Sequence, residues 1–230
     1  MSSKFAIFKK GLLDISPLLI PVVPFGIIFG AIGIELGFSP LITYATSLII
    51  FGGASQIVFI QLLSGGASSL VAVTSVGVIN SRHFLYGAVL TEYLEKLSLI
   101  KKLLISYLIT DQTFAVSSKY FKNHKINNHS HYHLIGAGVI LWTTWQVTTI
   151  IGIFLGSIVP EEWGLKFAIP LTFLAIIVND FRKLDHVIVM IISGISSLIF
   201  FDIPFKAYII LTPLIGLLSA LIIIKFKERI

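Results

Sequence analysis

The residues of this chain that could do chemistry stand within apolar sequence. An arginine and a histidine lie in the run Asn80-Ser81-Arg82-His83-Phe84-Leu85-Tyr86-Gly87. At 100° per residue, Arg82 and Tyr86 share one stripe of a helix, and Asn80, His83 and Gly87 share the neighbouring stripe. A polar face this broad is not tolerated against lipid. It indicates either a buried network that locks helices together or the lining of a transport path.

Asp111 is a second charged residue within apolar sequence, and it could be the partner of Arg82. The two residues lie near the middle of neighbouring apolar stretches, so an ion pair between them is geometrically possible. A paired Asp111 would stay ionised, whereas an isolated one would tend to take up a proton. The sequence therefore leaves open whether Asp111 forms a structural ion pair or carries protons.

Glycine and proline mark two places where a helix could be interrupted. The segment Gly52-Gly53-Ala54-Ser55-Gln56 lies in an apolar run, and adjacent glycines weaken a helix and allow another backbone or a ligand to approach. Ser55 and Gln56 could hydrogen-bond the polar groups of such a ligand, or backbone groups freed by a break in the helix. The segment from Pro21 through Pro24 to Gly26 predicts a kink or an unwound stretch. Interrupted helices often expose polar backbone at binding sites near the membrane midplane.

Four histidines, His124, His129, His131 and His133, have a spacing that could suit a metal. No carboxylate lies near them in the sequence, so we predict a solvated cytoplasmic loop and no metal site. The chain also lacks HExxH, GxSxG and cysteine, which argues against an enzyme. A dyad of Ser55 and His83 would be the remaining candidate for a membrane-embedded hydrolase. No cofactor is expected.

The composition identifies the class of protein. The 230 residues are 56% hydrophobic and 12% charged, with a mean hydropathy of +0.95. A soluble globule of this size could not bury so much apolar surface, so the chain is predicted to lie in a lipid bilayer. The net charge of +6 is then the lysine and arginine excess of cytoplasmic loops, and nucleic-acid binding is not expected.

The gaps between charged residues predict an all-α polytopic membrane protein, a bundle of seven or eight transmembrane helices with a Pro/Gly-interrupted first helix. Residues 1–230 are expected to form a single transmembrane permease domain. The first apolar run follows Lys4, Lys9 and Lys10 and has no convincing cleavage site after it, so it reads as a retained helix. The expected helices cover residues 15–36, 41–64, 68–92, 103–121, 133–157, 164–180, 184–201 and 205–225.

The lysines and arginines orient the second half of the chain and leave the first half undecided. The helix expected at 103–121 is short and carries Asp111, so it is the weakest of the eight. If this helix crosses, the chain has eight crossings and a cytoplasmic N-terminus; if it does not, the chain has seven crossings and an external N-terminus. The two arrangements place equal numbers of Lys and Arg in the cytoplasm. Both arrangements put Lys119, Lys122 and the C-terminus in the cytoplasm of a multi-pass protein of the cell membrane.

Several segments, in their order and spacing, resemble the AzlC family, the large permease subunit of branched-chain amino acid exporters. These segments are Pro24-Phe25-Gly26, Gly53-Ala54-Ser55-Gln56, Asn80 through Gly87, Thr110-Asp111-Gln112-Thr113-Phe114-Ala115 and, more weakly, Phe167 through Ala175. One departure is Gln112, where the resemblance leads us to expect glutamate. If that glutamate serves coupling in the family, this chain relies on Asp111 or works differently.

The resemblance implies a secondary transporter that exports leucine, isoleucine, valine or similar amino acids, together with a small hydrophobic AzlD-type membrane subunit, and it suggests proton coupling. The alternatives are a non-transporting structural subunit and the membrane-embedded hydrolase. A zwitterionic substrate needs donors for its carboxylate and acceptors for its ammonium group, and the polar residues above supply both. The candidate substrate or ion pathway comprises Pro24, Gly26, Gly53, Ser55, Gln56, Asn80, Arg82, His83, Tyr86, Asp111 and Gln112.

Overall fold

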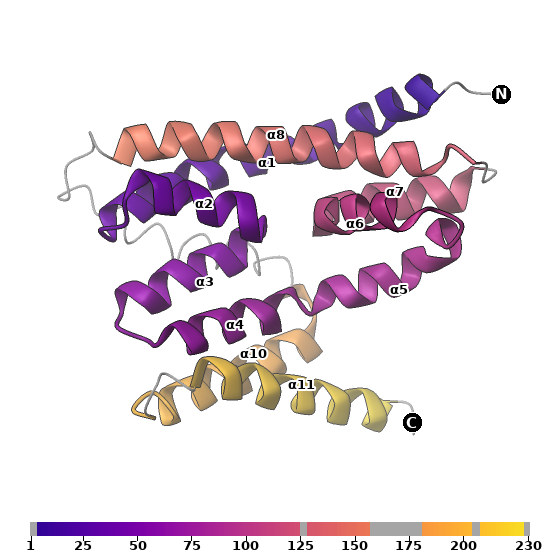
Figure 1. Cartoon of the computed structure of the whole chain (residues 1–230). Helices are drawn as coiled ribbons and strands as arrows, with labels where there is room; N and C mark the ends of the chain where they lie inside the picture. The colour runs from indigo at the N-terminus through magenta and orange to yellow at the C-terminus, as the bar shows by residue number, and fades with distance from the viewer. Residues whose placement is uncertain (1–3, 125–127, 157–180, 204–207, 228–230) are drawn as a thin grey trace. The chain divides into compact units, whose positions relative to one another are not determined.

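The computed structural model describes residues 4–124, 128–156, 181–203 and 208–227 (Figure 1). These residues form helices and turns, with no strand among them, which confirms the all-α class. The expected helix at 164–180 and the motif at Phe167 lie outside the described residues. The helices are α1 Lys4–Glu35, α2 Pro40–Ile50, α3 Gly53–Ser64, α4 Ser69–Asn80, α5 Arg82–Leu94, α6 Leu99–Leu108, α7 Asp111–Asn123, α8 His131–Gly156, α10 Leu184–Ile199 and α11 Tyr208–Lys227.

The chain groups into two compact units. The first contains residues 1–56 and 79–165, and the second contains residues 57–78 and 166–230. The prediction of a single membrane domain stays a prediction.

Helices α1 and α8 form the centre of the first unit and run parallel, side by side (Figure 1). By length and composition, both could cross a membrane. Glycines let their backbones touch: a methyl group at Gly136 would lie 2.2 Å from the carbonyl oxygen of Phe8, and one at Gly152 would lie 2.0 Å from that of Ile27. Because position 8 meets 136 and position 27 meets 152, the two helices begin at the same end of the unit.

Helix α1 stays helical through Pro17, Pro21 and Pro24, so the unwound stretch predicted at Pro21–Gly26 is not formed. Each proline removes one backbone hydrogen bond. Side-chain and backbone packing against α8 compensates here: Gly26 lies against Thr148 and the indole of Trp145.

Interruptions do lie in the three following predicted helices, each of which is two helices in the structure, and the first of them falls at the glycine pair that the sequence predicted. The stretch 41–64 breaks at Phe51 and Gly52, 68–92 breaks at Ser81, and 103–121 breaks at Ile109 and Thr110. The resulting helices have 10 to 13 residues, about 15–20 Å at 1.5 Å per residue. None of them alone spans a hydrocarbon core of about 30 Å.

Helices α6 and α7 form a hairpin that enters the first unit and returns to the same end. Leu108, at the end of α6, packs on Gly138 of α8. Ser117, further along α7, contacts His133, near the start of α8. The prediction of one crossing helix at 103–121 is therefore wrong for these residues, because the chain reverses at Ile109 and Thr110.

A hydrophobic cluster holds one end of the first unit together. It joins the start of α1, the ends of α5 and α7, α6 and the start of α8, and its buried members are Ile7, Leu90, Leu94, Ile105, Ile109, Tyr120, Phe121 and Leu134. Five helix termini thus share one end, which also carries Lys4, Lys9, Lys10, Lys96, Lys101, Lys102, Lys119 and Lys122. The turn after α1, residues 36–39, carries no lysine or arginine.

In the second unit, α10 and α11 pack as an antiparallel pair. Gly216 of α11 lies against Ser193 of α10. Lys227 at the end of α11 forms an ion pair with Asp185 at the start of α10. These helices correspond to the stretches predicted at 184–201 and 205–225.

Candidate functional site at three helix junctions

The junction between α6 and α7 is built by a capping box that starts α7. Thr110 adopts an extended backbone, and its hydroxyl accepts a hydrogen bond from the Thr113 amide at 3.3 Å. The Thr113 hydroxyl in turn accepts from the Thr110 amide at 2.7 Å. This reciprocal pair satisfies amides that the helix leaves free. It also places Asp111 in the first turn of α7, where the helix dipole favours a carboxylate.

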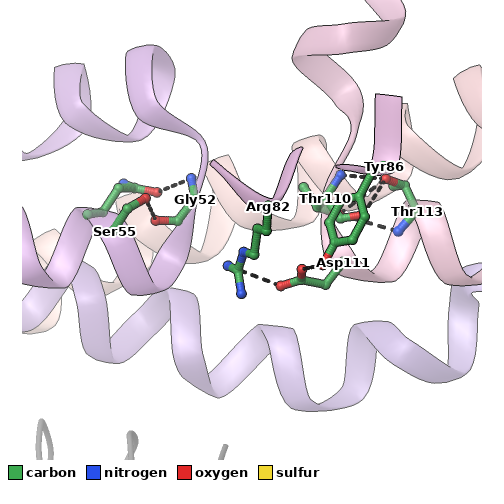
Figure 2. A network of polar contacts seen from close by, with 8 residues as sticks. Gly52, Ser55, Arg82, Tyr86, Thr110, Asp111 and Thr113 are labelled. Carbon is green, nitrogen blue, oxygen red and sulfur yellow. Dashed lines mark hydrogen bonds and ion pairs between the residues drawn. The ribbon is translucent and has the colours of Figure 1, made fainter. Parts of the chain in front are cut away.

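Asp111 is held from α5 through both of its carboxylate oxygens (Figure 2). Arg82 Nη2 lies 3.1 Å from Asp111 Oδ2, and the Tyr86 hydroxyl donates to Asp111 Oδ1 at 2.5 Å. The Tyr86 ring stacks on Phe114 at 4.4 Å. The ion pair expected from the sequence is therefore present. A cation and a hydroxyl donor thus occupy both oxygens of the Asp111 carboxylate.

At the junction between α2 and α3, backbone groups lack the hydrogen bonds that a continuous helix would give them. Phe51 takes the left-handed conformation with φ of 40°, which ends α2. The Gly52 amide donates to Gln56 Oε1 at 3.1 Å, and the Ser55 hydroxyl donates to the Gly52 carbonyl at 2.8 Å (Figure 2). Ser55 and Gln56 are fully buried. They satisfy the backbone freed by the break, one of the two roles that the sequence left open for them.

The end of α4 meets this junction. A methyl group at Gly52 would lie 3.2 Å from Asn80 Oδ1, so the amide of Asn80 lies against the Gly52 backbone. At these helix junctions, three polar atoms are buried and have no hydrogen-bond partner among the described residues: Gln56 Nε2, Asn80 Oδ1 and Arg82 Nε. Two are donors and one is an acceptor. Buried polar atoms without partners are rare in folded proteins, and each calls for an explanation such as a bound water, an ion or a functional role.

Aromatic side chains cover the other side of Gly53. A methyl group at Gly53 would lie 2.4 Å from the ring of Phe25 and 2.9 Å from that of Trp145. Tyr107 at the end of α6 donates to the carbonyl of Leu48 at 2.6 Å, which ties the α6–α7 junction to α2. Aromatic rings at Gly53 and hydrogen-bonding side chains at Gly52 thus lie next to each other.

The structure brings together most of the candidate residues. Those at the junctions, which we call the junction cluster, are Gly52, Gly53, Ser55, Gln56, Asn80, Arg82, Tyr86 and Asp111. His83 lies beside the cluster, with its ring 5.7 Å from that of Tyr86. Gln112 is half-buried, and no polar contact among the described residues joins it to Arg82 or Asp111. Pro24 is exposed on α1, and Gly26 packs α1 on α8, so neither faces the cluster.

Several residues of the site cannot be distinguished from ordinary core residues in the sequence. Thr110 and Thr113 position Asp111, and a Thr-x-x-Thr pair is a weak capping signal without knowledge that a helix starts there. Phe25, Tyr107 and Trp145 are aromatic residues in apolar runs. Only the folded chain places Phe25 and Trp145 against Gly53 and Tyr107 against Leu48.

The remaining polar candidates have other partners. No hydrogen bond joins Ser55 to His83 among the described residues, because the Ser55 hydroxyl is taken by Gly52. No metal-binding group of three or more His, Cys, Asp or Glu side chains is present in the part of the chain that the structure describes. The histidine-rich segment is not wholly a solvated loop. His131 and His133 begin α8 and are buried, His133 completely.

Comparisons with known proteins address the family directly. The family model described as "AzlC protein" matches residues 17–159, which include every segment of the junction cluster. A relative from Escherichia coli (strain K12), the inner membrane protein YgaZ, is 31% identical over 208 residues, 86% of this chain and 84% of that protein. A membrane protein of Archaeoglobus fulgidus is 30% identical over 202 residues, 86% of each chain.

A membrane protein of Helicobacter pylori (strain 26695) is 23% identical over 183 residues. No solved structure matches the chain. All three relatives are named as membrane proteins, and the matches cover 78–86% of their length, in agreement with the apolar helices seen here. By the match to its family model and by these relatives, the chain belongs to the AzlC family.

Proposed function

We propose that this chain is the large subunit of a two-component secondary transporter that exports branched-chain and related hydrophobic amino acids across the cytoplasmic membrane. The observation that carries the proposal is the meeting of three interrupted helices at one place. Each break carries polar side chains, and buried donors and an acceptor remain without partners there. Interrupted helices of this kind form substrate sites in secondary transporters.

The junction cluster has the chemistry that an α-amino acid requires. The donors Gln56 Nε2 and Arg82 Nε suit a carboxylate, and Asn80 Oδ1 accepts from an ammonium group. The rings of Phe25 and Trp145 beside Gly53 offer an apolar surface for a branched side chain. Such a site binds and releases its substrate without a nucleophile, so we expect a carrier and no enzymatic activity.

The direct test is efflux of preloaded labelled leucine, isoleucine and methionine from cells that express the chain, with and without a candidate small hydrophobic subunit. Efflux that needs both chains supports the complete proposal. Efflux from the large chain alone removes the two-component part. Absence of efflux for every amino acid, with both chains detected in the membrane, overturns the substrate class.

A substitution at Gly52 tests whether the junction is the binding site. A methyl group there would lie 2.6 Å from Ser55 Oγ and 3.2 Å from Asn80 Oδ1. We expect Gly52→Ala to raise the KM for leucine by about tenfold or more, since a buried polar group deprived of its hydrogen-bond partner costs about 1–3 kcal/mol. Gly87→Ala is the matched control, because a methyl group at Gly87 meets nothing within 4 Å. Equal KM values in the two variants would place the substrate elsewhere.

A further inference from the structure

A second polar cluster lies outside the junctions and is built around a fully buried histidine. His133 Nε2 lies 3.0 Å from Asp14 Oδ2 on α1, and His133 Nδ1 lies 3.1 Å from the Ser117 hydroxyl on α7. The imidazole stacks on the ring of Tyr120 at 4.1 Å. Three helices of the first unit therefore meet on one titratable ring.

The order carboxylate, imidazole, hydroxyl is also that of a serine hydrolase, but the burial is wrong for one. Ser117 is 0% exposed and His133 is 0% exposed, so no substrate carbonyl could reach the hydroxyl. The side chain of Asp14, in contrast, is 32% exposed. A proton can thus reach the cluster through Asp14, whereas a larger ligand cannot.

The hydrogen bonds of His133 suit both protonation states of the ring. In the neutral state, the ring donates from Nε2 to the Asp14 carboxylate and accepts at Nδ1 from Ser117. After protonation both nitrogens donate, to Asp14 and to the Ser117 oxygen. The Ser117 hydroxyl then turns its proton to a carbonyl of the preceding helical turn, as serines in helices commonly do. The ring therefore gains a proton without losing a partner.

The charges around His133 are few. Asp14 and Lys10 act on it from α1, and Lys10 pairs with Asp14 at 2.9 Å. From α7 and the residue after it come Tyr120 and His124, and His124 stacks on Tyr120 at 4.3 Å. The pair of Lys10 and Asp14 is neutral overall, so a proton on His133 makes the buried group cationic. The imidazolium then lies directly against the Asp14 carboxylate.

Helix α7 connects this cluster to the junctions. Ser117 lies six positions after Asp111, about 9 Å along a helix, and Asp111 begins that helix in contact with Arg82. A change in the hydrogen bond between His133 and Ser117 therefore acts on the element that positions the junction cluster. Asp111 itself is engaged by Arg82 and Tyr86 through both carboxylate oxygens, so α7 carries one polar cluster at its first residue and contacts the other through Ser117.

We propose that His133 binds the coupled proton, with Asp14 as its path to water and α7 as the link to the substrate site. This inference rests on the proposed transport function. Protonation of His133 would strengthen its contact with Asp14 and reverse the donor in its contact with Ser117. The α6–α7 hairpin is the element that would respond.

The test uses liposomes of phosphatidylethanolamine and phosphatidylglycerol that contain the chain and its small subunit. Net efflux of labelled leucine and movement of protons, followed with entrapped pyranine, are measured in the same preparation, and leucine–leucine exchange is measured separately as counterflow. We expect His133→Gln to lower the number of protons moved per leucine by about tenfold or more, because glutamine keeps a donor for Asp14 and does not titrate near neutral pH. The pH dependence of leucine flux should flatten in the same variant.

Two matched variants separate proton binding from a structural role. Ser117→Ala removes the hydrogen bond that links His133 to α7 but leaves the ring titratable, so it should also lower the number of protons moved per leucine, while the flux that remains keeps its pH dependence. His131→Gln is the control: it changes a buried histidine on the same helix that contacts neither Asp14 nor Ser117, and it should keep the wild-type ratio. A merely structural His133 would give a His133→Gln variant with lower leucine flux and an unchanged number of protons per leucine.

Each remaining outcome decides a stated point. An unchanged ratio in His133→Gln overturns the proton site, as does a His133→Gln variant that moves neither species, because loss of the proton alone leaves exchange intact. Wild-type leucine flux without proton movement overturns the proton site and leaves the export function standing. Absence of leucine flux in the wild type overturns the export function, and the proton site with it.

Discussion

Asp111, Arg82 and Tyr86 form one unit at the residue scale. Both oxygens of Asp111 are used by α5, at 3.1 Å from Arg82 and 2.5 Å from the Tyr86 hydroxyl. The side chains of Arg82 and Asp111 are 39% and 44% exposed in this chain, and we expect the membrane to surround them because the sequence around both is apolar. A charge left alone there costs several kcal/mol, so neither residue is expected to tolerate the loss of its partner.

Neutralising one partner should therefore do more harm than neutralising both. We expect Arg82→Gln and Asp111→Asn each to lower the melting temperature, and the double variant to lie above either single one. The reason is that the double variant leaves no unpaired charge, and pairs in contact couple by about 0.5–3 kcal/mol. Thermal unfolding of the purified protein in detergent, followed by tryptophan fluorescence, measures all three.

Leucine flux distinguishes the functional role of the pair from its structural one. If Arg82 or Asp111 contributes to transport, the double variant should stay impaired even where its stability recovers. Ser197→Ala serves as a control on α10, outside the junction cluster. If the fall in melting temperature of the double variant equals the sum of the falls in the two single variants, the two residues are not coupled.

The pairing of Arg82 with Asp111 could be predicted from the sequence, because an isolated charge in apolar sequence needs a counter-charge. The Tyr86 contact could not be, because tyrosines in apolar runs are usually core. The cluster around His133 was also not predicted. Asp14 lies 119 positions from His133, and only the parallel packing of α1 on α8 brings the two together.

At the element scale, the glycines of α1 and α8 let two helices touch through their backbones. A methyl group at Gly152 would lie 2.0 Å from the carbonyl oxygen of Ile27, a distance that no side chain movement can relieve. The two helices would have to move apart. Phe25 on α1 and Trp145 on α8, which both pack against Gly53, would then move apart as well. This packing also keeps α1 helical through its prolines.

Gly152→Ala should accordingly destabilise the protein. We expect a melting temperature lower by about 3–10 °C, from an overpacking cost of about 1–3 kcal/mol. Gly194→Ala, at a mid-helix glycine of α10 where a methyl group meets nothing within 4 Å, is the matched control. A melting temperature of Gly152→Ala at or above that of Gly194→Ala would show that the backbones are not in contact.

At the scale of the whole molecule, the lysines collect at one end of the first unit. The sequence left two arrangements of the first half equally supported: eight crossings with a cytoplasmic N-terminus, or seven with an external N-terminus if the span at 103–121 does not cross. The structure places the start of α1, the end of α5, both ends of the α6–α7 hairpin and the start of α8 at a single end. By the excess of positive charge in cytoplasmic loops, we expect this end to face the cytoplasm.

This orientation can be tested because the chain contains no cysteine. A membrane-impermeant maleimide added to intact cells should label Ser39→Cys, after α1, and should fail to label Ser98→Cys, before α6. Both should be labelled in permeabilised cells, which controls for reactivity. Labelling of Ser98→Cys in intact cells would reverse the orientation. The cytoplasmic C-terminus is a separate prediction, tested in the same way near Lys227.

The sequence by itself determined the class of protein, the family and most of the polar residues that the site uses. Burial of apolar surface and the cost of charge in lipid act on residue types and on short spacings, so composition and local pattern are sufficient for them. The sequence indicated the break at Gly52 through its adjacent glycines, but it did not indicate the breaks at Ser81 and Thr110. Apolar runs at 41–64, 68–92 and 103–121 satisfy the same hydropathy pattern whether each is one helix or two.

The tertiary structure decided which breaks form, because the packing of glycine backbones and junction residues against distant parts of the chain is not a local property. It also decided which polar residues meet. Gln56, Asn80 and Asp111 come from three separate segments, and the contacts that gather them depend on the fold of the whole first unit.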